Sequence, residues 1–198
     1  RVGMYSQLWS HVAAGEQIEG CTLFGTRPVA VEDDVWLVGS CIVASGVTIG
    51  RRTIALIGSN ITKSWPAESV IAGSPATAKP GLSAYRDVAL NEQWSMLSNW
   101  LASIAEGQGL RSTGSDGVLH LSWHDKSNQD AVVFTRLVDD ANRVRVQQPG
   151  ASVCCLETKT YLKRLSGLEH AVLKALGSNK ARVVSTQDFS TDVRRRPA

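Results

Sequence analysis

The sequence predicts a mainly β protein that begins as a parallel β-solenoid and ends in a small α+β domain. An aliphatic or small apolar residue returns at every sixth position from Val31 to Ile61, and a second register, from Val35 to Ser59, holds small or β-branched residues. A period of six belongs to neither a helix nor a single strand, so it indicates a repeat. Three six-residue units close a triangular coil, and successive coils stack their inward side chains in columns.

The first residues of the chain are predicted to form one irregular coil over 2–19. Val2, Leu8 and Ala14 keep the spacing of six, but the period slips between Glu19 and Arg27. A slip inside a repeat array is where a loop leaves the coil, and such loops often lie on the functional face. The alternative interpretation is a simple defect in a short solenoid.

The solenoid is predicted to end near residue 80. Pro66 and Pro75 remove backbone donors from the strand ladder, and Lys79-Pro80-Gly81 marks the exit from the repeat. The domains are therefore expected at 1–80 and 81–198. A loss of the six-residue period after Gly81 supports this division.

The second domain is expected to open with a helix at about 83–106 that begins at Ser83 and ends at Gly107. Its apolar stripe should lie across the end or side of the solenoid and protect exposed strand edges. Ser166 and Glu169 fit a capping box for another helix. The stripe is Leu90, Trp94, Leu97, Leu101 and Ile104, and the candidate strands are Gly117–Trp123, Ala131–Val138, Ser152–Leu156 and Ala181–Ser185.

Composition excludes few functions. The formal charge is +3, and a basic tail beyond Asp188, with Arg194-Arg195-Arg196, is expected to be disordered rather than bound to nucleic acid. The four cysteines lack metal spacing and indicate reduced thiols in a cytoplasmic protein, with Cys41 in the core. No membrane span or signal peptide is visible, although Arg1 leaves room for native turns before it.

Several spaced motifs carry a family resemblance over about residues 28–76. Pro28 to Gly39 opens the regular repeat, Ser45 to Gly50 and Gly58 to Lys63 continue it, and Val70 to Ala76 closes it. This stretch resembles the hexapeptide-repeat acyltransferases, the sugar, serine and antibiotic O-acetyltransferases. The resemblance implies a left-handed parallel β-helix, a homotrimer, and acetyl-CoA as the acyl donor between neighbouring solenoids. It does not extend to residues 81–198.

The resemblance also implies a histidine as the general base for the acceptor. His11 is the histidine of the solenoid half, and it precedes the slipped segment. The family histidine stands closer to the Pro-Val-x-Val segment than His11 does. Either the loop differs in length, or the catalytic histidine is lost and Gln17 or Glu19 stands in its place. An outward polar residue on a solenoid face is the competing interpretation of His11. No metal site is expected, because His120 and His124 belong to the second domain.

The resemblance also implies which residues bind the acyl donor, because the matching positions approach CoA in the resembling family. Small residues let a pantetheine arm lie along the coil, and Lys63 either meets a phosphate or is an ordinary exposed lysine. Trp36 is expected to face outward, at a subunit interface or ligand wall, or to pack under the loop at 19–27. The predicted donor-binding residues are Trp36, Gly39, Gly58, Ser59, Thr62 and Lys63.

These observations predict an acyl-CoA-dependent acyltransferase. The expected reaction is O-acetylation of a saccharide or another small hydroxylated acceptor, with N-acetylation as a variant. The second hypothesis is a catalytically inactive trimeric scaffold or binding module that keeps the fold and lacks the base. The spacing of His11 and the large extra domain favour this alternative.

Overall fold

The computed structural model describes residues 1–124, 130–177 and 179–189. Of the tail expected to be disordered beyond Asp188, only Phe189 is described, and it is buried in the core of the C-terminal unit; the basic residues lie outside the described ranges. The chain divides into two compact units, Arg1–Asp87 and Val88–Ala198. Each unit has a hydrophobic core of its own. The sequence placed the division after residue 80, and the structure places it after Asp87.

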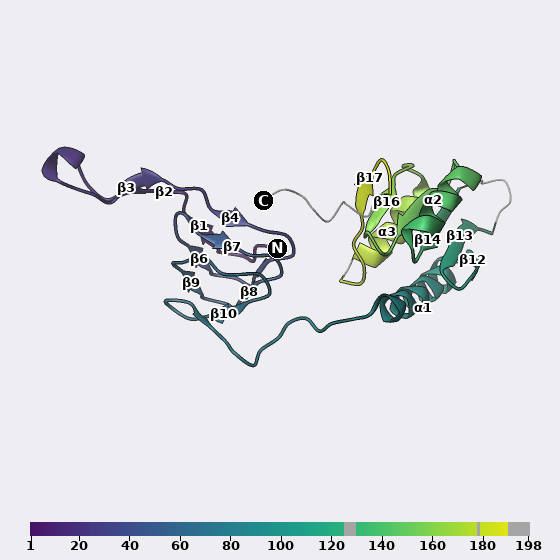
Figure 1. Ribbon diagram of the computed structural model, residues 1–198, viewed down its shortest axis with the longest axis horizontal. Helices are drawn as coiled ribbons and strands as arrows, with labels where there is room; N and C mark the ends of the chain where they lie inside the picture. Colours follow the sequence, from purple (N-terminus) through teal and green to yellow (C-terminus); the bar gives the residue numbers. More distant parts are fainter. Residues whose placement is uncertain (125–129, 178, 190–198) are drawn as a thin grey trace. The chain divides into compact units, whose positions relative to one another are not determined.

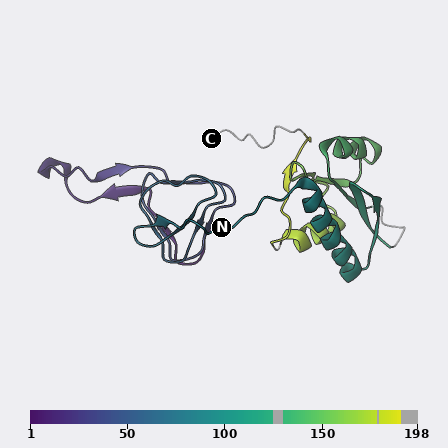
Figure 2. The same cartoon turned by 60° about the horizontal axis from the view of Figure 1, so that its bottom comes forward.

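The N-terminal unit is a stack of three-sided coils (Figure 2). Each short strand pairs in parallel with the strand three repeat units further along the chain, as Ile42 does with Asn60. This offset is the three units of six that the sequence predicts. The pairs are β4 (Ala30–Val31) with β7 (Thr48–Ile49), β5 (Trp36–Leu37) with β8 (Ile54–Ala55), and β6 (Ile42–Val43) with β9 (Asn60–Ile61).

Both inward registers are confirmed over the regular coils. The aliphatic column is buried from Leu37 onward, and the small or β-branched column is buried throughout. Cys41 is a core residue, as expected, and its thiol lies 3.5 Å from the Leu56 carbonyl oxygen. The buried members are Leu37, Val43, Ile49, Ala55 and Ile61 in one register, and Val35, Cys41, Val47, Thr53 and Ser59 in the other.

The first coil departs from the expectation. Val2 bridges to Leu37 and β1 (Gln7–Leu8) pairs with β6, although these partners stand nearly twice as far apart in the sequence as a regular pair does. The coil therefore contains an insertion, and the chain leaves it already at Ser10. The prediction that Ala14 continues the column is wrong, because the backbone at Ala14 pairs in a hairpin instead.

The inserted residues form an arm, defined here as Ser10–Arg27, which projects from the coils (Figure 1). β2 (His11–Ala13) and β3 (Phe24–Thr26) pair in antiparallel fashion, and a single 3₁₀ turn, η1 (Gln17–Glu19), lies at the tip. The arm has no buried residue. Its first strand begins at His11, well before the slip that the sequence shows at Glu19.

The last coil ends in a different way. β10 (Val70–Ala72) pairs in parallel with β8 and in antiparallel fashion with β11 (Thr77–Ala78), which covers the edge of the sheet. The Arg52 guanidinium lies over the Tyr85 ring, 5.1 Å from its centroid. This contact holds the segment after β11 beside the coils of its own unit.

The C-terminal unit is built on a six-stranded sheet with the order β12-β13-β14-β15-β16-β17. The first three strands are antiparallel neighbours, and the parallel pairs β14–β15 and β16–β17 each require a helical crossover. The strands are β12 (Leu110–Ser115), β13 (Val118–Trp123), β14 (Ala131–Thr135), β15 (Ser152–Cys155), β16 (Thr160–Leu162) and β17 (Val184–Thr186).

Three helices cover the two faces of this sheet. α1 (Leu90–Gln108) and α3 (Gly167–Gly177) pack with Leu121 and Phe134 on one face. α2 (Val138–Gln147) packs with Val133 and Val153 on the other face. The unit is thus a three-layer α/β sandwich.

The first helix, α1, does not use its apolar stripe to cover the solenoid as expected. The apolar stripe of α1 forms, but Trp94, Leu97, Leu101 and Ile104 are buried in the core of their own unit. The stripe is therefore not available to cover the end of the solenoid. The helix begins at Leu90 rather than 83, and it passes through Gly107 to end before Gly109, which is left-handed at φ +63°.

Candidate active site

The two ends of the arm, Ser10 and Arg27, form its neck, which lies at one corner of the stacked coils. The Arg27 backbone N–H donates to the Ser10 carbonyl at 2.9 Å, and the Arg27 carbonyl accepts from the Gly46 N–H at 3.3 Å. One coil further on, Lys63 occupies the position of Ser45, because Val43 pairs with Ile61. We call this the arm corner and define it as Ser10, Arg27, Ser45, Gly46 and Lys63.

His11 lies beside the arm corner, as the first residue of β2 and opposite Thr26. Its side chain is exposed, and no side-chain hydrogen bond to it is found within the described ranges. Thr62 precedes Lys63 at the same corner and is exposed too. The fold therefore brings together three of the residues predicted from sequence.

Gly39 and Gly58 stack on the neighbouring corner of the coils, which we call the glycine corner. The Gly58 N–H donates to the Gly39 carbonyl at 2.9 Å. Gly58 is left-handed at φ +73°, and a Cβ added there would meet no atom within 4 Å. The surface beside Gly58 is open, so an extended ligand can approach the backbone closely at this corner.

One face of the coil, formed by β1, β6 and β9, separates the two corners. Its side is one repeat unit long, which is about 20 Å at the rise of an extended chain. The residues predicted for the site thus form two groups, one at the arm corner and one at the glycine corner. A single protomer does not join His11 and Gly58 in one small pocket.

Trp36 faces outward as predicted, with 43% of its surface exposed. It pairs with Ile54, which in turn pairs with Val70, so these three side chains form an apolar column outside the coil. The corresponding outward positions on the next face are Gln7, Ile42 and Asn60. The Trp36 face is the more apolar of the two.

The side chain of Ser59 points into the coil. It is fully buried, and its hydroxyl donates to the Leu56 carbonyl at 2.5 Å inside the coil. A hydroxyl in this position cannot reach a ligand on the outer surface. Only the backbone of Ser59, next to Gly58, remains near the glycine corner.

Trp65 is a site residue that the sequence reasoning missed. The Lys63 Nζ lies 4.9 Å from the centroid of the Trp65 ring, which holds the ammonium group over the indole. The indole Nε1 is buried and has no hydrogen-bond partner in the part of the chain that the structure describes. The signal was present in the Lys-x-Trp spacing, which places the two residues close together at one corner of the coil.

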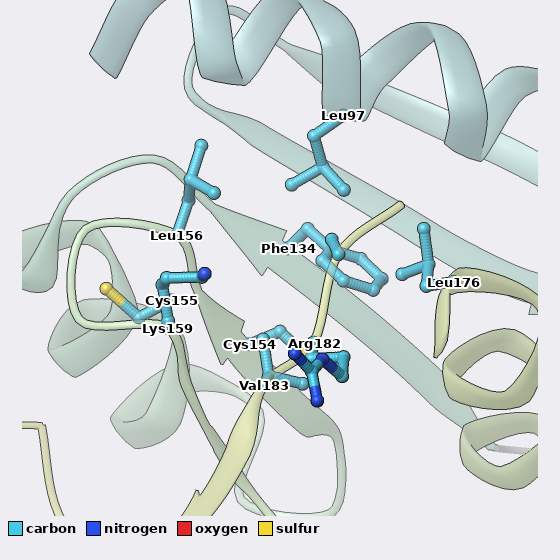
Figure 3. A pocket seen from close by; sticks show the side chains of 10 residues that line it. Leu97, Phe134, Cys154, Cys155, Leu156, Lys159, Leu176, Arg182 and Val183 are labelled. Atoms are coloured by element: carbon cyan, nitrogen blue, oxygen red, sulfur yellow. The ribbon is translucent and has the colours of Figure 1, made fainter. Parts of the chain in front are cut away.

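The enclosed pocket of the C-terminal unit is not a ligand site (Figure 3). Leu97, Phe134 and Leu176 surround it together with Cys154, and its volume is about 20 Å³, enough for about one water molecule. Burial raises the pKa of the Cys154 thiol, and the neighbouring Glu169 and Cys155 raise it further. A thiol that stays protonated is a poor nucleophile, so this cysteine serves packing.

The described residues were compared with what a metal site and a membrane-spanning helix require. Across residues 1–124, 130–177 and 179–189, no three His, Cys, Asp or Glu side chains are grouped as metal ligands would be. No helix within the same ranges combines the length and apolar character needed to cross a bilayer.

Comparison with known proteins gives a partial sequence match. No family model matches the chain. The 2,3,4,5-tetrahydropyridine-2,6-dicarboxylate N-acetyltransferases of Staphylococcus aureus strains JH9 and Mu3 are 36% identical over 67 residues, which are 33% of this chain and 28% of the relative. The chain thus matches less than a third of the length of these relatives. The resemblance to hexapeptide-repeat acetyltransferases is confirmed.

Solved structures of hexapeptide-repeat acetyltransferases are also found. A Vibrio cholerae enzyme in complex with acetyl coenzyme A is 22% identical, with a TM-score of 0.35, covering 43% of this chain and 48% of that chain. A maltose O-acetyltransferase from Clostridium difficile is 25% identical, with a TM-score of 0.36, covering 43% and 46%. Each similarity spans less than half of this chain.

Proposed function

We propose that this protein is an acetyl-CoA-dependent acetyltransferase with the left-handed parallel β-helix of the hexapeptide-repeat enzymes. Its preferred reaction is O-acetylation of a saccharide or another small hydroxylated acceptor. The observation that carries the proposal is the sequence match to acetyltransferases, combined with coils that repeat after every three six-residue units. The S. aureus relatives are N-acetyltransferases by name, so an amine acceptor is the variant of this reaction.

Acetyl-CoA fits the outer surface of the coils at both corners. The open backbone at Gly58 accepts a pantetheine arm in close contact, and the Lys63 ammonium offers a positive charge to a phosphate. Trp65 keeps that ammonium group in place through its ring. Thr62 adds an exposed hydroxyl beside it.

His11 is proposed as the general base. An imidazole nitrogen takes the proton of the acceptor hydroxyl while the oxygen attacks the thioester carbonyl carbon. The C–O bond forms, the C–S bond breaks, and the CoA thiolate leaves and takes up a proton. A backbone N–H of a coil would hold the oxyanion that develops during the attack.

A homotrimer is proposed because two copies can unite the two groups of site residues. The arm corner of one protomer would face the glycine corner of its neighbour, and acetyl-CoA would lie between them. Exposed apolar residues support contacts of this kind, both on the Trp36 face and on the arm, where Ile18 is 91% and Leu23 65% exposed. Isolated two-stranded hairpins are marginally stable in water, so the arm gains from a partner surface.

A scaffold without catalytic activity is the second candidate. The observation in its favour is the lack of a described group that orients the His11 ring. Catalytic histidines usually have their second nitrogen held by a carboxylate or carbonyl. In the trimer that group would come from the partner, whereas in a scaffold it is absent.

Thermal unfolding with and without acetyl-CoA is the first test. A ligand at a hundred times its dissociation constant stabilises the folded protein by about 2.7 kcal/mol, so the melting temperature should rise. Sedimentation in the same buffer should show particles of three chains. No shift with millimolar acetyl-CoA would favour the scaffold.

His11→Ala then tests the base in an acceptor screen. We expect the rate of acetyl transfer to fall by about two to four orders of magnitude while the acetyl-CoA shift in melting temperature persists. His124→Ala, an exposed histidine of the other unit, is the matched control and should keep full activity. Unchanged turnover in His11→Ala would remove His11 from the mechanism.

A further inference from the structure

The C-terminal unit carries a second, larger cavity that the acetyltransferase proposal does not use. It is an open groove of about 570 Å³ between the end of β16 and the first turns of α3. This volume lies within the range of small-molecule sites, which is about 300–1,000 Å³. The groove is formed entirely within this unit.

Positive charge borders the groove from two elements. Lys163 directly follows β16, while His170 and Lys174 lie one helical turn apart on α3. All three side chains are exposed, and none forms an ion pair with another described residue. Residues four apart on a helix are neighbours, so His170 and Lys174 direct their donors toward the same space.

One carboxylate lines the groove, and it already has donors of its own. Glu169 is 4% exposed, and its Oε2 accepts hydrogen bonds from Ser152 Oγ at 2.5 Å and from the Arg164 backbone N–H at 2.6 Å. The two lysines therefore leave an excess of positive charge at the groove. An anion placed between them would meet two ammonium groups, one from each side of the groove.

The wall of the groove also has an apolar part. Tyr161 and Leu173 line it, and both pack against the core of the unit, which fixes their positions. Burial raises the pKa of the Tyr161 phenol, and the nearby Glu169 carboxylate raises it further, so the hydroxyl stays protonated at neutral pH. An aromatic ring with a free donor suits a flat ligand with hydroxyl groups.

We propose that this groove binds the phosphate or carboxylate group of a small acidic sugar. Lys163 and Lys174 contact the anion from the two walls, and the ring of Tyr161 packs against the sugar. The groove is formed by residues of the C-terminal unit alone, and the proposal stands whether or not the N-terminal unit transfers acetyl groups.

The test is a titration of the intact chain with small ligands. Binding is monitored by calorimetry and by the chemical shifts of backbone amides. The probes are glucose 6-phosphate, glucuronate, inorganic phosphate and uncharged glucose. We expect one or both acidic sugars to bind, inorganic phosphate to bind more weakly, and glucose not to bind. Glucose 6-phosphate and glucuronate distinguish a phosphate from a carboxylate ligand. The shifted amides should fall within residues 161–174.

Variants decide whether the groove is the site. Lys163→Gln combined with Lys174→Gln should weaken the acidic sugar by about tenfold or more, while Lys180→Gln, an exposed lysine outside the groove, should leave the affinity unchanged. Tyr161→Leu should weaken the sugar but not inorganic phosphate. The proposal is overturned if no acidic sugar binds, if the double variant binds normally, or if phosphate alone binds as tightly as the sugars.

Discussion

Val43 and Ile42 are adjacent on β6 but have opposite surroundings. Val43 is fully buried in the inward column, whereas Ile42 points outward and is 41% exposed. Val43→Asp should prevent folding of the coils, because a buried charge without a partner costs several kcal/mol. Ile42→Asp is the matched control and should fold. Circular dichroism and thermal melting check both, and a cooperative melt of Val43→Asp would show that the register is wrong.

His120 gives the stability of the C-terminal unit a pH dependence. Burial lowers the pKa of this half-buried imidazole from its ordinary value of 6.5, whereas the unfolded chain keeps the ordinary value. Below pH 6.5 the unfolded state then binds more protons, so the free energy of unfolding falls as the pH decreases. At higher pH both states are neutral and the effect vanishes.

Urea unfolding at several pH values checks this prediction. The wild-type protein should lose stability relative to His120→Gln as the pH falls from about 7.5 to about 5.5. The two proteins are compared by the slope of the free energy of unfolding against pH rather than by its absolute value, because the substitution itself changes packing on β13. Parallel curves for the two proteins would contradict it.

At the scale of the elements, α1 shows that a helix can be predicted correctly and assigned to the wrong partner. Its apolar stripe was visible in the sequence, but the sheet it covers lies further along the chain. Helical periodicity specifies a face, not what the face packs on. The sheet is the partner because its own face is apolar, with Leu121, Val132 and Phe134 buried against the helix.

Leu101 on α1 allows the independence of the two units to be tested. Leu101→Ala should destabilise the C-terminal unit by about 2–5 kcal/mol, since the side chain is fully buried there. The coils should keep their own stability, because their core shares no residue with this cluster. Met96→Ala, exposed on the same helix, should change little.

The measurement for Leu101→Ala is unfolding followed by amide signals assigned to each unit. Signals from residues 88–189 should be lost at lower denaturant concentration than in the wild-type protein. Signals from the coils should keep their midpoint. Equal shifts in both units would show that they unfold together.

α2 and the arm show where local patterns mislead. The run from Ala131 to Val138 looked like one strand, yet it ends at Thr135, and Val138 begins a helix whose first turn holds Asp139 and Asp140. The period of six appeared to continue to Ala14 by coincidence, although the backbone had left the coil at Ser10. Neither error could be detected without knowing the pairing partners.

For the whole molecule, features set by contacts between neighbouring coils could be predicted from the sequence, whereas features that depend on the distance between separate corners could not. Each regular coil repeats the one before it, so each position is specified by its neighbours above and below, and both inward registers were predictable from Val35 to Ile61. The candidate site was predictable as a set of residues but not as a geometry. His11 and Gly58 lie on different corners of one protomer, so the sequence pattern did not show how far apart they are.

The short distance between the two ends of the arm affects how the chain would tolerate a change in the length of this insertion. Ser10 and Arg27 lie within hydrogen-bonding distance, so the inserted segment begins and ends at nearly the same point. The closure of the coil therefore depends on contacts at Ser10 and Arg27 rather than on the residues between them. Segments of unrelated length could replace the arm without a shift in register, which makes this corner a natural point for grafting foreign peptides onto a rigid frame.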